Sequence, residues 1–349
     1  MNPGILLTFA YLGERGAPHL LFLSPEGRGE GEGEMGMKRV KVRVPATTAN
    51  LGPGFDVLAL ALRLYNTVEM EVGTDKTGKK LQIDIVGEGE GNLPRDRRNI
   101  VYRAAKLVFD KFHPAPYTLR LKLNNRIPLA SGLGSSAAAR IGGLVCANRL
   151  CGDRLSREEI LNLAAEIEGH ADNVSAAMMG GLVVCCISSP KGRKGREIEI
   201  VKFNPSENLS CVVCIPDFQV LTSEARKILP KTVKFEQAVF TSSRVALLLA
   251  ALIKRRYELL GMAMEDRLHQ PYRKRLVKGM EEVFEQTLRA GALGVSLSGA
   301  GPSILAFTAS SKPSLAERVG EAMREAFGRH KIESRYLVLG IDREGTKIA

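Results

Sequence analysis

Hydrophobic positions along this chain repeat with a period of two in some segments and of three to four in others. In residues 117–123 leucines alternate with polar side chains, as in a strand with one buried face, whereas in residues 157–168 apolar side chains recur on one helical face. Strands are predicted over residues 40–44, 66–72, 81–86, 117–123, 180–187, 197–203, 209–215, 294–297, 304–308 and 333–339. Helices are predicted over residues 101–113, 135–150, 157–168, 222–229, 235–256, 258–266, 279–289 and 314–327. This order favours an α+β fold over a doubly wound parallel sheet.

A glycine- and serine-rich turn links one of these strands to one of these helices. Residues 128–139 read Pro-Leu-Ala-Ser-Gly-Leu-Gly-Ser-Ser-Ala-Ala-Ala. Gly132 and Gly134 allow close backbone approach to an anion, and the free amides of a helix start point at such a ligand. The turn lacks the lysine of a P-loop and is not Gly-x-Gly-x-x-Gly. It therefore predicts a phosphate site outside those two motifs, although an ordinary loop is an equal alternative when the turn is taken alone.

Two further segments accompany this turn. Residues 42–62 contain Pro-Ala-Thr-Thr-Ala-Asn-Leu-Gly-Pro-Gly-Phe-Asp, and residues 294–307 contain Ser-Gly-Ala-Gly-Pro-Ser. In order and spacing, the three segments resemble the motifs of the kinases of galactose, homoserine, mevalonate and phosphomevalonate, the GHMP superfamily. The first segment, His-Ala-Asp-Asn at 170–173, Ser-Glu-Ala-Arg at 223–226 and Gln-Pro-Tyr-Arg at 270–273 resemble the homoserine kinase family in particular. The resemblance covers the chain from about residue 38 to its end.

The resemblance implies a two-domain α+β GHMP kinase fold. Its N-terminal domain, like domain 2 of ribosomal protein S5, would bind ATP over residues 37–205, and a ferredoxin-like C-terminal domain would span residues 206–349. Residues 1–36 include a Gly/Glu-rich repeat that buries too little apolar surface to fold. They are expected to be a disordered or mis-assigned extension, with translation starting at Met37.

The donor half of the active site is expected at the glycine turn. The resemblance implies ATP binding by Pro128, Leu129, Ala130, Ser131, Gly132, Leu133, Gly134, Ser135, Ser136, Ala137 and Ala138. Mg²⁺ takes few carboxylates in such sites, and the resemblance implies Ser136 and Glu168 as its ligands, with Glu166 left open as a replacement. Arg140, where relatives usually carry small or apolar residues, is expected to face solvent or a partner and not to touch the phosphate site.

The acceptor half is expected to hold opposite charges, because homoserine carries both an ammonium and a carboxylate. The resemblance implies substrate binding by Asn50, Asp56, His170, Thr222, Arg226, Arg273 and Gly299, and catalysis by Asp172, Asn173 and Ser136. A guanidinium suits a carboxylate because it donates two parallel hydrogen bonds, which places Arg226 and Arg273 there. Asp172 is either a general base or an anchor.

Structural roles compete with these assignments. Asn50 and Asp56 are good turn formers beside Gly-Pro-Gly, His170 could be a structural histidine, and Arg273 could be an exposed cation. The glycines of residues 298–303 could only turn a strand.

The expected function is ATP-dependent phosphorylation of the L-homoserine hydroxyl in threonine biosynthesis, with ATP and Mg²⁺ and a homodimeric enzyme. A sibling kinase of mevalonate or shikimate and a non-catalytic ligand-binding sensor are the alternatives. Intact Ser135, Ser136, Glu168 and Asp172 argue against the sensor.

The amino-acid composition limits the classes of molecule that the protein is expected to bind. The net charge of +12 suits phosphate-bearing ligands, but scattered charges, 5% aromatic residues and no tryptophan argue against nucleic acid. No uninterrupted apolar run reaches the ~18 residues of a membrane span.

Cys211 and Cys214 lie in an apolar strand, where positions three apart face opposite sides, so a metal or redox pair is disfavoured. Unpaired cysteines fit a reducing compartment, and a cytoplasmic location is expected.

Overall fold

A computed structural model describes residues 38–73, 80–112, 118–188, 197–309 and 313–349. All of them belong to one compact unit, Gly36–Ala349. The expected extension of residues 1–36 and the expected start at Met37 lie outside the described residues.

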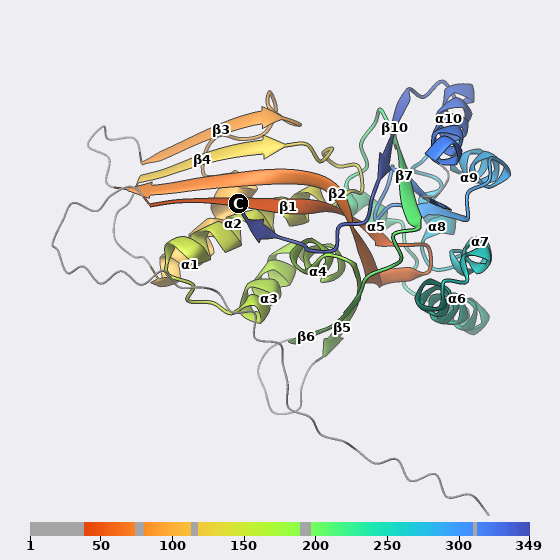
Figure 1. Cartoon of the computed structure of the whole chain (residues 1–349), viewed down its shortest axis with the longest axis horizontal. Helices are drawn as coiled ribbons and strands as arrows, with labels where there is room; N and C mark the ends of the chain where they lie inside the picture. Colours follow the sequence, from red (N-terminus) through yellow and green to blue (C-terminus); the bar gives the residue numbers. More distant parts are fainter. Residues whose placement is uncertain (1–37, 74–79, 113–117, 189–196, 310–312) are drawn as a thin grey trace, which may run out of the picture. The chain divides into compact units, whose positions relative to one another are not determined.

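The first sheet has seven strands and carries four helices on one face (Figure 1). Its order is β11-β1-β2-β4-β3, with β5 added to β2 and β6 added to β5, and only β3 and β4 run parallel. The strands are β1 (Lys38–Asn50), β2 (Gly54–Gly73), β3 (Leu81–Gly87), β4 (Thr118–Asn125), β5 (Leu182–Ser188), β6 (Glu197–Phe203) and β11 (Lys347–Ile348). The helices are α1 (Ile100–Phe112), α2 (Ser135–Leu150), α3 (Arg157–Glu168) and α4 (Asp172–Met179).

Small residues let α2 lie close to its neighbours. A Cβ at Gly142 would run into the Val68 side chain of β2, and one at Gly143 would run into the Val101 carbonyl of α1. The alternating leucines of β4 are all buried, as the period-two pattern predicts. The glycine- and serine-rich turn of residues 128–139, from here on the phosphate loop, therefore leads into a helix that packs closely against both β2 and α1.

The second sheet has four antiparallel strands in the order β10-β7-β9-β8. They are β7 (Leu209–Pro216), β8 (Gly294–Leu297), β9 (Ile304–Ala309) and β10 (Ser334–Leu339). Helices α9 (Met280–Arg289) and α10 (Pro313–Arg329) pack against this sheet. Cys211 and Cys214 of β7 are free thiols buried in two different clusters of apolar side chains, which confirms that they face opposite sides of a strand.

Five further helical elements lie in the chain between β7 and β8 of the second sheet. They are α5 (Thr222–Lys227), α6 (Phe235–Lys254), a 3₁₀ turn η1 (Tyr257–Leu259), α7 (Leu260–Ala263) and α8 (Gln270–Arg273). By length and composition alone, α6 is the one helix within the described ranges that is apolar enough to span a membrane, although a charged residue, Arg244, lies near its middle. This departs from the expectation that no such segment exists, because that expectation counted only uninterrupted apolar runs.

The predicted α+β class is confirmed, and the ranges of α2, α3, β6 and β8 agree with the predicted segments. The single helix predicted over residues 258–266 is wrong, since η1 and α7 occupy part of it and end at Ala263. Helices α4 and α8 and strand β11 were not predicted. Helix α4 has eight residues, α8 has four and β11 has two, so each is too short to show a repeating hydrophobic pattern.

The expected domain boundary near residue 205 stays a prediction. It lies in the connection between β6 of the first sheet and β7 of the second. The end of the chain returns to the first sheet, where β11 pairs with β1 through Val42–Ile348 and Arg43–Lys347.

Candidate active site

One pocket collects residues from widely separated parts of the chain. It is lined by residues 130–136 of the phosphate loop and by Ala300 and Phe55. It is also lined by Asn50, Asp56, Glu168, His170, Asp172, Asn173, Thr222, Arg226, Arg273 and Gly299. Every residue assigned to substrate, catalysis or metal from the sequence is therefore at this pocket. Of the residues assigned to ATP, Pro128, Leu129, Ala137 and Ala138 lie outside its lining, the two alanines because they face the core.

Hydrogen bonds tie the three glycine-containing segments together. The Ser298 hydroxyl donates to the Gly132 carbonyl at 2.8 Å, and the Ser303 amide donates to the Ser131 carbonyl at 3.2 Å. The Thr47 amide of β1 donates to the Leu133 carbonyl at 3.1 Å. A Cβ at Gly132 would collide with the Ser298 carbonyl. The glycines of residues 298–303 thus do more than turn a strand, because they pack on the phosphate loop.

The phosphate loop opens α2 without a side-chain cap. Gly134 is the N-cap residue, with φ 68°, and it makes no side-chain capping hydrogen bond to the helix. A Cβ at Gly134 would collide with the Thr47 hydroxyl. Free amides at a helix start form an anion site, so the geometry suits a phosphate.

Ser136 and Glu168 meet at the edge of this loop. Glu168 is the last residue of α3, and its Oε2 accepts a hydrogen bond from the Ser136 hydroxyl at 3.2 Å. The two oxygens are suitable in type for Mg²⁺, and their separation is near the roughly 3 Å between adjacent ligands of a Mg²⁺ octahedron. Glu166, two residues earlier on the helix, lines a different hollow with Leu107 and Lys111. The structure therefore brings Glu168 and not Glu166 to the pocket.

The expectation for Arg140 is wrong. Its Nη1 donates to both the Ser136 hydroxyl and the Glu168 carboxylate, so the guanidinium contacts the two oxygens assigned to the metal. The contact follows from helix geometry, because residues four apart on α2 lie on the same face. Burial, with a smaller contribution from the charge of Arg103, lowers the pKa of Arg140; the guanidinium is nevertheless charged at neutral pH.

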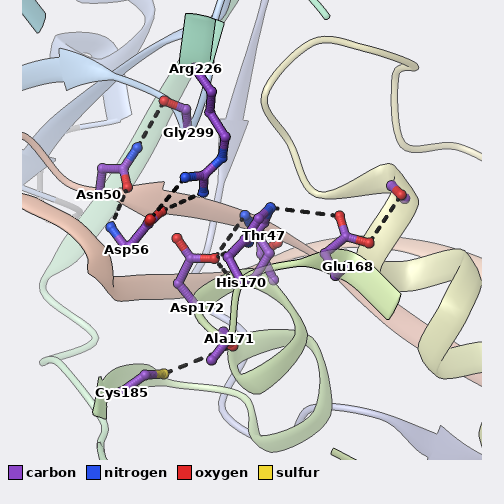
Figure 2. Close-up of polar contacts among 12 residues, drawn as sticks. Thr47, Asn50, Asp56, Glu168, His170, Ala171, Asp172, Cys185, Arg226 and Gly299 are labelled. Atoms are coloured by element: carbon purple, nitrogen blue, oxygen red, sulfur yellow. Dashed lines mark hydrogen bonds and ion pairs between the residues drawn. The ribbon is translucent and has the colours of Figure 1, made fainter. Parts of the chain in front are cut away.

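A carboxylate and a guanidinium face each other across the acceptor half of the pocket (Figure 2). Arg226 of α5 donates two hydrogen bonds to Asp56, at 2.6 and 3.0 Å. The hydrogen bond to Asp56 raises the pKa of Arg226. Asn50 positions this pair, because its Oδ1 accepts from the Asp56 amide at 3.1 Å and its Nδ2 donates to the Gly299 carbonyl at 2.9 Å.

Backbone strain marks the same place. Asn50 and Asp56 both have left-handed backbones, with φ of 72° and 59°. Non-glycine residues rarely adopt this conformation, and such outliers concentrate at binding sites. The two residues do flank the turn between β1 and β2, but their side chains also reach the pocket.

The His-Ala-Asp-Asn stretch is the start of α4. His170 Nδ1 donates to Asp172 Oδ1 at 2.6 Å, and the same oxygen accepts from the Asn173 amide at 2.6 Å (Figure 2). Asn173 Oδ1 in turn accepts from the Thr47 hydroxyl at 2.7 Å. Asp172 is only 2% exposed. A nearly buried carboxylate is thus held in one orientation at the junction of the two halves.

Arg273 is buried, so the alternative that it is merely an exposed surface cation is wrong. It is 2% exposed, and its Nη1 donates to the Gly299 carbonyl at 2.9 Å, while Nε donates to the Ala225 carbonyl at 3.2 Å. Burial and the charge of Arg226 lower the pKa of Arg273 to about 10. A buried guanidinium aimed at a pocket is a strong site for an anion.

Two residues that support Arg273 were not predicted. His269 Nε2 donates to the Gly52 carbonyl at 2.6 Å, which leaves Nδ1 to accept from Arg273 at 3.3 Å. The Phe55 ring lies 5.1 Å from the Arg273 guanidinium and 5.4 Å from that of Arg226. Phe55 lies within the first recognised motif and His269 directly precedes the Gln-Pro-Tyr-Arg motif, but neither residue type signals such a role in the sequence.

Comparison with known proteins agrees with this geometry. Residues 99–181 match the family described as GHMP kinases N terminal domain, and residues 248–329 match GHMP kinases C terminal. Homoserine kinase from Carboxydothermus hydrogenoformans is 42% identical over 302 residues, which are 86% of this chain and 94% of that protein. The chain belongs to the homoserine kinase family of GHMP kinases. Homoserine kinase from Moorella thermoacetica is 46% identical over 83% of this chain and 93% of its own length.

The fold of this homoserine kinase family member also matches a solved structure. The crystal structure of homoserine kinase from Cytophaga hutchinsonii aligns with a TM-score of 0.78 and 31% identity, and covers 93% of this chain and 100% of that one. The predicted two-domain GHMP kinase fold is therefore confirmed.

Proposed function

We propose that this protein is an ATP-dependent homoserine kinase, which transfers the γ-phosphoryl group of ATP to the hydroxyl of L-homoserine. The product is O-phospho-L-homoserine, in threonine biosynthesis. The observation that carries the proposal is the charge distribution of the pocket, in which Arg226 and Arg273 lie beside Asp56 and Asp172. This arrangement complements an amino acid that carries a carboxylate and an ammonium.

The donor side would be served by the phosphate loop. Residues 134–136 at the start of α2 line the pocket, and their amides would bind phosphate oxygens. Mg²⁺ would be held by Ser136 and Glu168 and, when bound, neutralises charge on the β and γ phosphates. Phosphoryl transfer needs positioning and charge stabilisation more than covalent chemistry, so a rigid loop tied to the rest of the site by hydrogen bonds is suitable.

The acceptor side would fix the substrate at three points. Arg226 and Arg273 would bind the carboxylate, Arg273 with the N–H groups that it does not donate to the protein. Asp56 would bind the ammonium in exchange for part of its contact with Arg226. Asp172, which His170 holds in place, would bind the hydroxyl. Asn50, Asn173, Thr222 and Gly299 complete this proposed binding set.

Substrate choice is tested by ADP release with L-homoserine, mevalonate, shikimate and galactose in parallel. We expect turnover with L-homoserine at a kcat/KM at least about 100-fold above that for the others, because neither sugars nor mevalonate match both charges. Turnover confined to another alcohol would replace the assignment by a sibling kinase, and no turnover with any of them would favour a ligand-binding sensor.

The role of Asp172 is tested by Asp172→Asn. If Asp172 is an anchor, the variant raises the KM for homoserine and leaves the pH dependence of kcat unchanged. If Asp172 is the general base, kcat falls by about 100-fold or more, and the decrease of kcat at low pH disappears from the pH profile.

A cytoplasmic location and a homodimer belong to the same proposal. The six free cysteines support a reducing compartment. The homodimer rests on the family resemblance and is checked by light scattering on the purified protein.

A further inference from the structure

A cationic side chain already occupies the place where the metal would bind. Arg140 Nη1 donates to both Ser136 Oγ and Glu168 Oε2, and these two oxygens lie 3.2 Å apart. Neither oxygen can bind a metal ion at the usual ~2.1 Å while a guanidinium nitrogen lies against both of them. Metal ion and guanidinium therefore exclude each other at this pair.

The local charges explain why the guanidinium lies there. Glu168 ends α3, where the negative end of the helix dipole adds to the carboxylate charge. The Glu168 side chain is 10% exposed and that of Arg140 is 21% exposed. Leaving such a carboxylate unpaired would be costly, and Arg140 supplies the missing positive charge until another cation arrives.

We propose that Arg140 is a built-in counter-ion that holds Ser136 and Glu168 together in the metal-free protein and must be displaced when Mg²⁺ binds. The inference rests on the proposed function, because it assumes that these two oxygens are metal ligands. Its consequence is that Arg140 weakens metal binding in the absence of nucleotide. The protein would then load its metal together with the nucleotide, rather than beforehand.

The displaced guanidinium has a favourable place to go once nucleotide is bound. Phosphate oxygens at the phosphate loop would accept charge-assisted hydrogen bonds from a guanidinium. Arg140 would thus pass from the Glu168 carboxylate to the nucleotide as the metal takes its position.

The test is a Mn²⁺ titration of the nucleotide-free protein, followed by the electron paramagnetic resonance signal of free Mn²⁺. Arg140→Met and Arg140→Gln are each expected to bind Mn²⁺ more tightly than the natural protein by about tenfold or more. Arg149→Met is the matched control, because Arg149 lies on the same helix in an exposed pair with Asp153; it should leave the affinity unchanged.

A double variant locates the effect. Adding Glu168→Gln to Arg140→Met is expected to abolish the gain in Mn²⁺ affinity. Unchanged affinity in both Arg140 variants would overturn the proposal, as would a gain that survives Glu168→Gln. Because the titration contains no homoserine, a protein that passes it but phosphorylates a different alcohol would lose the proposed function alone.

Discussion

At the scale of single residues, three carboxylates of the pocket already have side-chain partners. Asp56 pairs with Arg226, Glu168 with Arg140, and Asp172 with His170. A ligand group that binds one of these carboxylates therefore takes the place of its present partner. Such an exchange reduces the desolvation cost of binding, because the carboxylate passes from one partner to another and is not stripped of all its contacts at once.

Replacing Arg226 by alanine tests the acceptor side. We expect Arg226→Ala to raise the KM for homoserine by about 10- to 100-fold, while the KM for ATP changes less than about threefold, because Arg226 lies on the acceptor side of the pocket. Steady-state kinetics with each substrate varied in turn measures both values. Equal increases in the two KM values would show that Arg226 is not a carboxylate binder. The control is Arg244→Ala, which removes the ion pair between Arg244 of α6 and Glu265.

Two neighbouring glutamates on α3 provide a matched comparison of the metal assignment. Glu168→Gln is expected to lower kcat by about 100-fold, because a carboxylate would be lost from the metal, whereas Glu166→Gln should change it less than about threefold. The Mg²⁺ dependence of ADP release measures both variants. Similar losses in the two variants would contradict the assignment of Glu168.

The motif residues were predictable because kinase chemistry restricts the residue types at each place. Arg140 and His269 were not, since their roles depend on what lies opposite them. Arg140 meets a carboxylate from α3, and His269 meets a carbonyl from the turn between β1 and β2. Contacts of this kind join residues 28 and 217 positions apart, and no local pattern encodes them.

At the scale of elements, the active site depends on the close approach of loops. Gly132 has φ 82° and lies against the carbonyl of Ser298, whereas Gly152 has the same φ of 82° with nothing near its missing Cβ. Substitutions at these two glycines therefore distinguish the cost of a left-handed backbone, which both share, from the cost of a steric collision, which only Gly132 would have. Helix periods and strand alternation predict most elements, but this approach of two loops follows only from the tertiary fold.

Alanine at each of these glycines gives different expected losses. Gly152→Ala should lower the free energy of unfolding by about 1 kcal/mol, the cost of a left-handed backbone. Gly132→Ala should cost about 3 kcal/mol or more, because overpacking adds to that strain, and should abolish turnover. Urea denaturation and ADP release measure both effects. Equal stability losses at the two positions would mean that the contact with Ser298 yields without cost.

At the scale of the whole molecule, one buried histidine links stability to pH. His269 is fully buried, and burial lowers its pKa to about 4. The unfolded chain binds a proton near the ordinary pKa of about 6.5, so stability is full above that pH and falls as the pH drops toward 4. The loss from this group is at most about 3 kcal/mol.

The variant His269→Gln isolates that contribution. It is expected to be less stable than the natural protein at pH 7 but to lose less stability between pH 6.5 and pH 4.5. Urea denaturation at a series of pH values gives both slopes. If the free energy of unfolding fell equally steeply with falling pH in the two proteins, a group other than His269 would be responsible for the loss of stability in acid.

The last strand has a consequence for how the protein is made. Strand β11 consists of Lys347 and Ile348, and the amide of Ala349 also donates to the Lys41 carbonyl of β1 at 2.8 Å. Residues 347–349 are synthesised long after β1 and β2, so this edge of β1 has no partner strand until they emerge from the ribosome. A chain truncated before residue 347 would therefore expose this edge of β1 as a site for aggregation.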